Sequence, residues 1–336
     1  MEKIIKRDKL TDLLKGYACF LVVLGHVIMG IRKAGINITF GVFELEEFIW
    51  TFHVALFMFL SGYVYNITDG WKSKNTRIKF IVHKLINLGI PYLVFSIIYI
   101  LINSLISSSN TQMHVRDILF LWKEPVAQYW FLYALFILFF IWTIMSKFLS
   151  NLQITISILI IGMLGNYCNI SFGIFDSAIS MALPFGIGTC LNKFYIDKKS
   201  TKEKLILITI HIIVTLVIIT NGVENYFVDK LDCMLGIFAS IALISILQKN
   251  KIIEKILEKI NKKSFPIYLL HTIFSAGIRI VLIKIGIENY FIHLIFGLTF
   301  GFICPYIVAL ITEKCAILDI WFYPSKNIKK LKGIKI

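Results

Sequence analysis

Ten apolar stretches, separated by short polar and basic segments, follow one another along the whole chain. Each is near the ~20 residues that a membrane-spanning helix needs, although the seventh is short and Pro184 interrupts the sixth. The pattern predicts an all-α polytopic membrane protein with about ten transmembrane helices. The predicted spans are 13–31, 47–67, 85–106, 128–146, 152–169, 174–192, 205–220, 231–248, 264–283 and 290–312.

Composition supports this prediction. Hydrophobic residues make up 57% of the chain and charged residues only 16%, whereas charged residues form about a quarter of a soluble domain. The spans account for most of the length, so we expect residues 1–336 to form one transmembrane domain without a separate soluble domain. The first apolar stretch follows a basic leader but lacks a small-residue cleavage pattern, so we interpret it as a retained span.

Lysine and arginine are distributed unevenly between the two sets of loops. Both termini and the even-numbered loops carry 27 of these residues, and the odd-numbered loops carry six. Because cytosolic loops of membrane proteins are enriched in Lys and Arg, both termini and the loops 68–84, 193–204 and 249–263 are predicted to be cytosolic. This asymmetry accounts for the net charge of +15 without a nucleic-acid partner.

Two further sequence features concern contact with the membrane surface and the chemistry of the cysteines. Segment 251–263 has apolar residues at helical spacing between lysines, which predicts an amphipathic helix on the inner leaflet. The six cysteines show no CxxC or other ligand spacing, so neither a metal site nor a disulfide framework is indicated.

The first span contains the strongest candidate for chemistry. Lys15 lies at its cytosolic start, and His26 follows eleven residues later, which is ~16 Å along a helix or about half a bilayer. A histidine at this depth is costly to bury and therefore indicates a functional site. The alternative is a histidine that hydrogen-bonds a neighbouring helix and only supports packing.

His53 lies in the second span, at a depth similar to that of His26 on an adjacent antiparallel helix. The two imidazoles could share one cavity, or His53 could belong to an interfacial belt with Trp50. In the same span, the small pair at 61–62 favours a close helix contact over a nucleophile, because no base precedes Ser61 in an elbow motif.

The fourth and ninth spans contain further polar candidates. Trp130 opens the fourth span, where an aromatic belt is the simplest interpretation. His271, in the inner third of the ninth span, could face a cofactor from the cytosol or bond a neighbouring helix. Arg279, further out, requires a partner or a wet cavity unless it snorkels outward. Glu47 and other acidic residues of the external loops could bind an acceptor.

Four short motifs, in order, resemble the acyltransferase-3 family of integral membrane acyltransferases, in its sugar O-acetylase (fucose-4-O-acetylase-like) branch. Lys15 and His26 fit a basic-x10-His motif, although many members have Arg at the first position. The other three motifs are Phe52-His53 through Ser61-Gly62-Tyr63, the Trp-Phe-Leu segment from Trp130, and the Ser-x-x-x-Tyr-Leu-x-His motif from Ser264 to His271. The resemblance covers nearly the whole chain.

The resemblance implies an acyl-CoA donor in the cytosol, acetyl-CoA by branch, and a hydroxyl of a glycan or glycolipid as acceptor. It places the protein in the plasma or inner membrane, among membrane lipids, and implies neither a metal nor nucleic acid. With the spacing arguments above, we expect His26 and His53 to be catalytic. We expect Lys15, Tyr268 and His271 to bind the donor, and Glu47, Trp130 and Arg279 to bind the acceptor.

Two other functions use similar features. A transporter or flippase of a glycan or lipid-linked precursor also contains intramembrane His and Arg, but should show a repeat, and none is evident. A glycan polymerase is expected to have a large external loop, whereas the longest predicted external stretch, 107–127, is modest. Release of CoA by the purified protein would separate the transferase from both alternatives.

Overall fold

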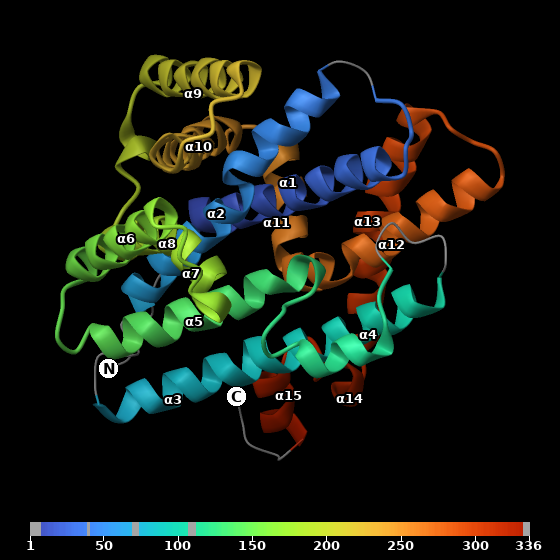
Figure 1. The fold of residues 1–336 in the computed structure, drawn as a ribbon, viewed down its shortest axis with the longest axis horizontal. Helices are drawn as coiled ribbons and strands as arrows, with labels where there is room; N and C mark the ends of the chain where they lie inside the picture. The colour runs from blue at the N-terminus through green and yellow to red at the C-terminus, as the bar shows by residue number, and fades with distance from the viewer. Residues whose placement is uncertain (1–7, 39–40, 69–73, 107–111, 332–336) are drawn as a thin grey trace. The chain divides into compact units, whose positions relative to one another are not determined.

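The computed structural model describes residues 8–38, 41–68, 74–106 and 112–331 (Figure 1). Within these ranges the chain forms helices and no strand, which confirms the predicted all-α class. Eight helices in the described part are long and apolar enough to cross a membrane, so the chain is a polytopic membrane protein. The basic residues Lys3, Lys6, Arg7, Lys72, Lys332 and Lys335, which entered the topology prediction, lie outside the described residues.

All ten predicted spans coincide with helices, but two of them differ in kind. Residues 152–169 form the shorter helix α6 (Asn151–Tyr167), and 174–192 form a pair, Gly173–Ser180 and Ala182–Cys190, bent by 48°. The count of ten therefore stays a prediction. The eight long helices are α1 (Lys9–Lys33), α2 (Val42–Thr68), Thr76–Leu105 within α3, η1 and α4, Ala127–Met145 with α5, α9 (Thr201–Asn221), α10 (Tyr226–Leu247), α12 (Ser264–Lys284) and α13 (Tyr290–Thr312).

The bend in the sixth predicted span has a local cause. Between α7 (Asp176–Ser180) and α8 (Ala182–Cys190), Pro184 cannot donate the backbone hydrogen bond that a helix would direct to the Ser180 carbonyl. The ammonium group of Lys230 donates to that carbonyl instead, at 2.8 Å. The Lys230 side chain thus compensates the polar group that the proline leaves without a backbone donor.

The helices divide into two compact units, which are described separately. Among the described residues, the first unit comprises those within 1–22, 40–72 and 141–264, and the second comprises those within 23–39, 73–140 and 265–336. Helices α1 and α5 (Trp130–Met145) contribute residues to both.

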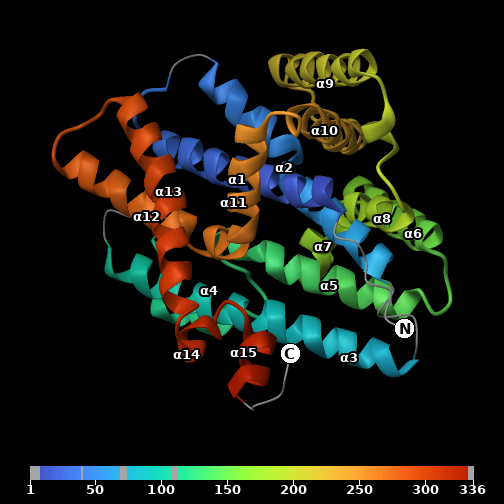
Figure 2. The ribbon, with the colours of Figure 1, turned by 180° about the vertical axis from the view of Figure 1, so that it is seen from behind.

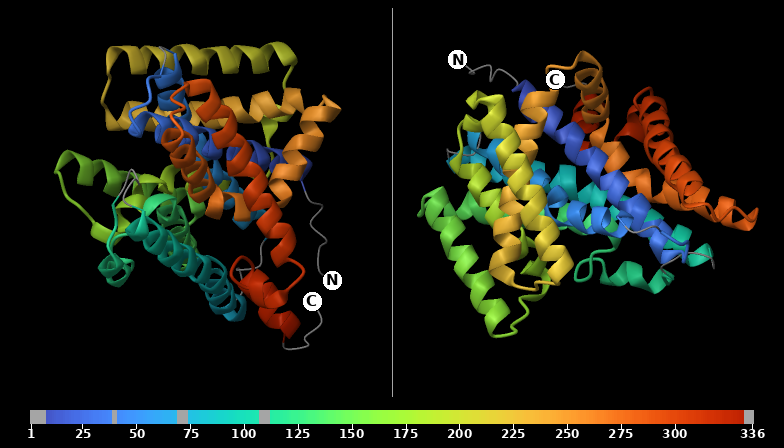
Figure 3. Two further views of the ribbon diagram at one scale, coloured as in Figure 1. Left: turned by 90° about the vertical axis from the view of Figure 1, so that its right-hand side faces the viewer. Right: turned by 90° about the horizontal axis from the view of Figure 1, so that it is seen from above.

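In the first unit, α2 packs against α8 and α10, and α10 lies beside α9 (Figures 2 and 3). Glycines permit the α2–α8 contact. A Cβ atom at Gly62 would overlap the carbonyl of Phe185, and one at Gly188 would overlap the carbonyl of Phe59. The prediction that the 61–62 pair marks a close helix contact is confirmed.

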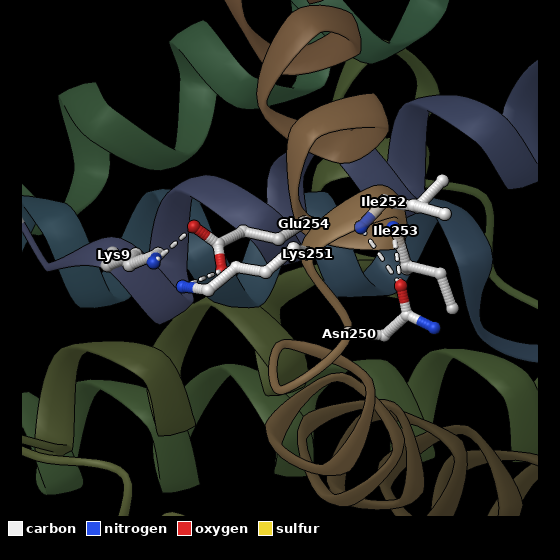
Figure 4. A network of polar contacts seen from close by, with 6 residues as sticks. All are labelled: Lys9, Asn250, Lys251, Ile252, Ile253 and Glu254. Carbon is white, nitrogen blue, oxygen red and sulfur yellow. Dashed lines mark hydrogen bonds and ion pairs between the residues drawn. The ribbon is translucent and has the colours of Figure 1, made fainter.

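The amphipathic segment forms α11 (Lys251–Lys262), which belongs to the first unit. The Asn250 side chain accepts hydrogen bonds from the backbone N–H groups of Ile252 and Ile253 in the first turn of α11 (Figure 4). The Glu254 carboxylate forms an ion pair with Lys9 at 2.5 Å. This hydrogen bond to the Lys9 ammonium, with a weaker one to Lys251, keeps the pKa of the Glu254 carboxyl below its ordinary value. The amphipathic helix is confirmed, and its position on the inner leaflet stays a prediction.

Candidate active site

The imidazoles of His26 and His271 lie against each other in the second unit. His26 is on α1 and His271 is on α12, with ring centroids 4.9 Å apart and ring planes at 80°. His271 is fully buried, whereas His26 is half-buried. The structure therefore brings two predicted site residues together, and of the two rings the His26 ring is the more accessible.

Backbone carbonyls fix the proton position on His271. Its Nδ1 lies 3.0 Å from the Ile267 carbonyl oxygen and 2.9 Å from that of Tyr268. A carbonyl oxygen can only accept, so Nδ1 must carry the hydrogen, and in the neutral ring Nε2 is the acceptor. The ring of His271 is thus held in one orientation beside His26.

Helix α13 contacts α1 close to the histidine pair through two glycines. A Cβ atom at Gly297 would lie 2.7 Å from Val27, and one at Gly301 would lie 3.1 Å from Val23. Val23 and Val27 are four residues apart and share one face of α1. Small residues at this contact let α13 approach closely, which fixes the helix that carries His26.

Arg279 lies one helical turn beyond the histidine pair along α1. Its guanidinium group occupies the space beside Gly30, where a Cβ atom would overlap it, and Gly30 follows His26 by four residues. Only 8% of Arg279 is exposed, and the Tyr99 side chain of α4 (Ile90–Leu105) is close enough to act on it electrostatically. The structure therefore gives Arg279 a buried position near His26 rather than an outward-snorkelling one.

Three hydrogen bonds attach the turn directly before α5 to α12. The Tyr268 hydroxyl donates to the Gln128 carbonyl, the Gln128 amide donates to Thr272 Oγ1 at 2.8 Å, and the Tyr129 hydroxyl donates to the Leu269 carbonyl at 2.8 Å. Gln128 and Tyr129 belong to the 3-10 turn η3 (Ala127–Tyr129) and are buried. This network braces the turn of α12 that carries His271.

The aromatic start of α5 differs from a simple interfacial belt. Tyr129 is fully buried against α12, Trp130 is half-buried, and the Trp130 ring meets that of Phe131 edge-on at 6.5 Å. Directly before this segment, Ala127 adopts a left-handed backbone conformation (φ 46°), which is unusual for a residue with a side chain. No sequence signal indicated the hydrogen bonds of Gln128 and Tyr129.

The remaining predicted residues belong to the first unit. His53 is fully buried, and its Nδ1 lies 2.8 Å from the Ile49 carbonyl oxygen, so Nδ1 donates. Its ring meets that of Trp50 edge-on. Lys15 is half-buried on α1, and Glu47 is half-buried on α2. The shared cavity of His26 and His53 stays a prediction because the two residues belong to different units.

The first unit also contains a buried polar cluster that the sequence analysis missed. Thr215 donates to Asp232 Oδ1 at 2.7 Å and lies 3.0 Å from His211 Nδ1, which must therefore be the donor to the threonine oxygen. All three are almost fully buried, and the rings of Phe48 and Phe52 pack on His211. The available signal was a histidine and an aspartate inside apolar spans.

Comparison with known proteins agrees with this arrangement. A family model described as an acyltransferase domain matches residues 11–310, which include His26, Arg279 and His271 and nearly all of each helix of the site. No curated protein and no solved structure matches the chain. Together with the multi-pass helical fold, the match shows that the chain belongs to the acyltransferase-3 family and is a membrane acyltransferase.

Proposed function

We propose that the protein transfers an acyl group, acetyl in the first instance, from cytosolic acyl-CoA to a hydroxyl of a cell-surface or lipid-linked glycan. The observation that carries this proposal is the His26–His271 pair, held in the apolar interior with Arg279 nearby. Family membership favours a transferase over a transporter or flippase, which was the alternative from the sequence.

In the proposed reaction, His26 acts as the general base. It takes the proton of the acceptor hydroxyl, and the resulting oxygen attacks the thioester carbonyl. The carbon–sulfur bond then breaks, and the departing CoA thiolate takes the proton back from His26. His271 positions the His26 ring, and Arg279 supplies a cation that binds the acceptor. A transient acyl-histidine is the second route, in which His26 attacks the thioester first.

The remaining assignments follow the sequence interpretation. Lys15 offers a positive charge to one of the CoA phosphates at the cytosolic surface. His53 is the second catalytic histidine, and Glu47 contributes to acceptor binding. Tyr268 and Trp130 complete the donor and acceptor sites in this scheme. The hydrogen bond from Tyr268 to Gln128 supports a role in shaping the site.

Release of free CoA tests the function directly. Purified protein in detergent, given acetyl-CoA and a glycan acceptor, is expected to release CoA with transfer of labelled acetyl to the acceptor. The control is the same preparation without acceptor, in which release should be slow. If CoA release does not rise with acceptor and no label moves, across several glycan and glycolipid acceptors, the transferase proposal is wrong and transport should be assayed.

Substitutions of Lys15 test whether this lysine binds the donor or only sets the membrane topology. Lys15→Ala is expected to raise the KM for acetyl-CoA about tenfold with kcat nearly unchanged, because a phosphate loses one charge-assisted contact. Lys15→Arg keeps the cation and should retain a near-normal KM. Steady-state kinetics with varied acetyl-CoA measure both. An unchanged KM in Lys15→Ala would leave this lysine with a topological role only.

A further inference from the structure

A basic pocket lies in the second unit between the α3–η1 junction and the C-terminal helix. Helix α3 (Lys74–Lys84) continues into η1 (Leu85–Gly89), and α15 (Pro324–Leu331) lies beside them (Figures 1 and 2). The pocket has a volume of about 330 Å³, which is at the lower end of the range for small-molecule sites. Its lining includes Lys84, Asn87, Tyr323, Ser325, Lys326 and Lys329.

Hydrogen bonds between the two walls keep the pocket in shape. The Asn87 amide donates to Ser325 Oγ at 2.8 Å, and the Ser325 backbone N–H donates back to Asn87 Oδ1 at 3.2 Å. The same amide also donates to the His83 carbonyl at 2.8 Å. The residues in contact are 238 positions apart, so this is a tertiary clamp rather than a helix-end feature.

The charge of the pocket is positive. Lys84 and Lys329, from opposite walls, both lie close enough to His83 to act on it electrostatically. The Lys84 ammonium sits over the Phe139 ring at 4.0 Å, which holds the cation in place without neutralising it. Lys326 lies 3.5 Å from the buried carboxylate of Asp319, which also accepts a hydrogen bond from Asn327. Three lysines line the pocket, and two carboxylates, Asp319 and Glu313, lie close enough to its Tyr323 to act on it electrostatically. The lysines outnumber these acidic groups, which favours an anionic ligand.

The pocket is connected to the helix of the histidine pair. Tyr323, in its lining, places its ring 6.1 Å from that of Phe265 near the start of α12. Phe265 precedes His271 by six residues, or ~9 Å along the helix. A phosphate held here would leave the pantetheine arm of CoA able to extend toward the level of His26.

We infer that this pocket binds phosphate esters, and that phosphate groups of the CoA donor other than the one assigned to Lys15 occupy it during transfer. The inference about the donor rests on the proposed function. Lysines bind phosphate as point charges, and the Ser325 hydroxyl, which accepts from Asn87, keeps its own hydrogen to donate to a phosphate oxygen. The headgroup of an anionic phospholipid presents the same chemistry and is the second source of phosphate that the test must separate.

The test uses the double variant Lys326→Gln/Lys329→Gln, with Lys330→Gln as the matched control. Lys330 is an exposed lysine on the same helix and lies outside the pocket lining. The double variant is expected to raise the KM for acetyl-CoA about tenfold at similar kcat, whereas Lys330→Gln stays within twofold of the parent protein. Direct binding of adenosine 3′,5′-bisphosphate, which needs no acyl transfer, should weaken by a similar factor.

The measurements distinguish CoA from lipid as the source of the phosphate, and they test the phosphate site separately from the transferase function. The double variant could keep the nucleotide binding and KM of the parent protein but lose a higher activity in phosphatidylglycerol than in phosphatidylcholine vesicles. In that case the pocket holds a lipid phosphate and not the donor. If neither nucleotide nor lipid response changes, the phosphate site is refuted while the transferase function stands. If the parent protein binds the nucleotide through the pocket yet transfers no acyl group, the proposed function fails and the site remains.

Discussion

Replacing His26 with glutamine or alanine is expected to lower the rate of acyl transfer by about 10²–10⁴-fold, the usual contribution of a general base. His26 is half-buried, whereas its partner His271 is fully buried and directs its Nδ1 hydrogen to backbone carbonyls. The accessible ring is therefore the one that can reach a substrate. Glutamine keeps hydrogen-bonding capacity but cannot accept a proton at neutral pH, so it should be almost as inactive as alanine.

A second histidine of the same unit provides the matched control. His293 on α13 is 1% exposed, and its Nε2 lies 2.7 Å from the Ile287 carbonyl oxygen, so it acts as a packing residue. His293→Gln should retain most of the transfer rate per folded molecule. Transfer is measured with labelled acetyl-CoA, and the folded fraction by size-exclusion profile. A well-folded His26→Gln protein with near-normal activity would contradict the catalytic assignment.

The pattern of apolar residues was sufficient to predict where the helices lie in the sequence, but not which helices pack against one another. The spacing of Lys15 and His26 within one apolar run indicated a site, because a polar group inside a span is visible against its surroundings. The contact of His26 with His271 could not be predicted. Both lipid-facing and helix-facing positions of a span are apolar, so the pattern gives depth and not the partner helix.

The same limit explains the other differences. Hydrogen bonds between polar side chains join segments that are far apart in the sequence, as in the pairs Gln128–Thr272 and Asn87–Ser325. The sequence around one residue of such a pair does not indicate which residue it will bond. His211 and Asp232 were visible as polar residues in apolar spans, but Thr215 between them was not distinguishable from other threonines. The small pair at 61–62 was more informative about helix packing, because small residues inside a span indicate that another helix approaches closely there.

Substituting Gly62 or Gly188 with alanine is expected to have the largest effect on stability. Each added methyl group would overlap a backbone carbonyl of the facing helix, α8 for Gly62 and α2 for Gly188. A flexible side chain could rotate away, but a helix carbonyl cannot, so the two helices must separate along the contact. Overpacking of a core costs about 1–3 kcal/mol, and occasionally more, and we expect these variants at the upper end.

Gly277 is the control position for the Gly62 and Gly188 variants, because a Cβ atom there meets nothing within 4 Å. Gly277→Ala removes a helical glycine without a clash and should stabilise by up to about 1 kcal/mol, the difference in helix propensity. Heating detergent-solubilised protein and measuring the monodisperse fraction should therefore give a lower midpoint for Gly62→Ala and Gly188→Ala, and an equal or higher one for Gly277→Ala. Midpoints for Gly62→Ala and Gly188→Ala equal to that of the parent protein would mean that α2 and α8 do not meet backbone to backbone. The close packing that we assign to the first unit would then be wrong.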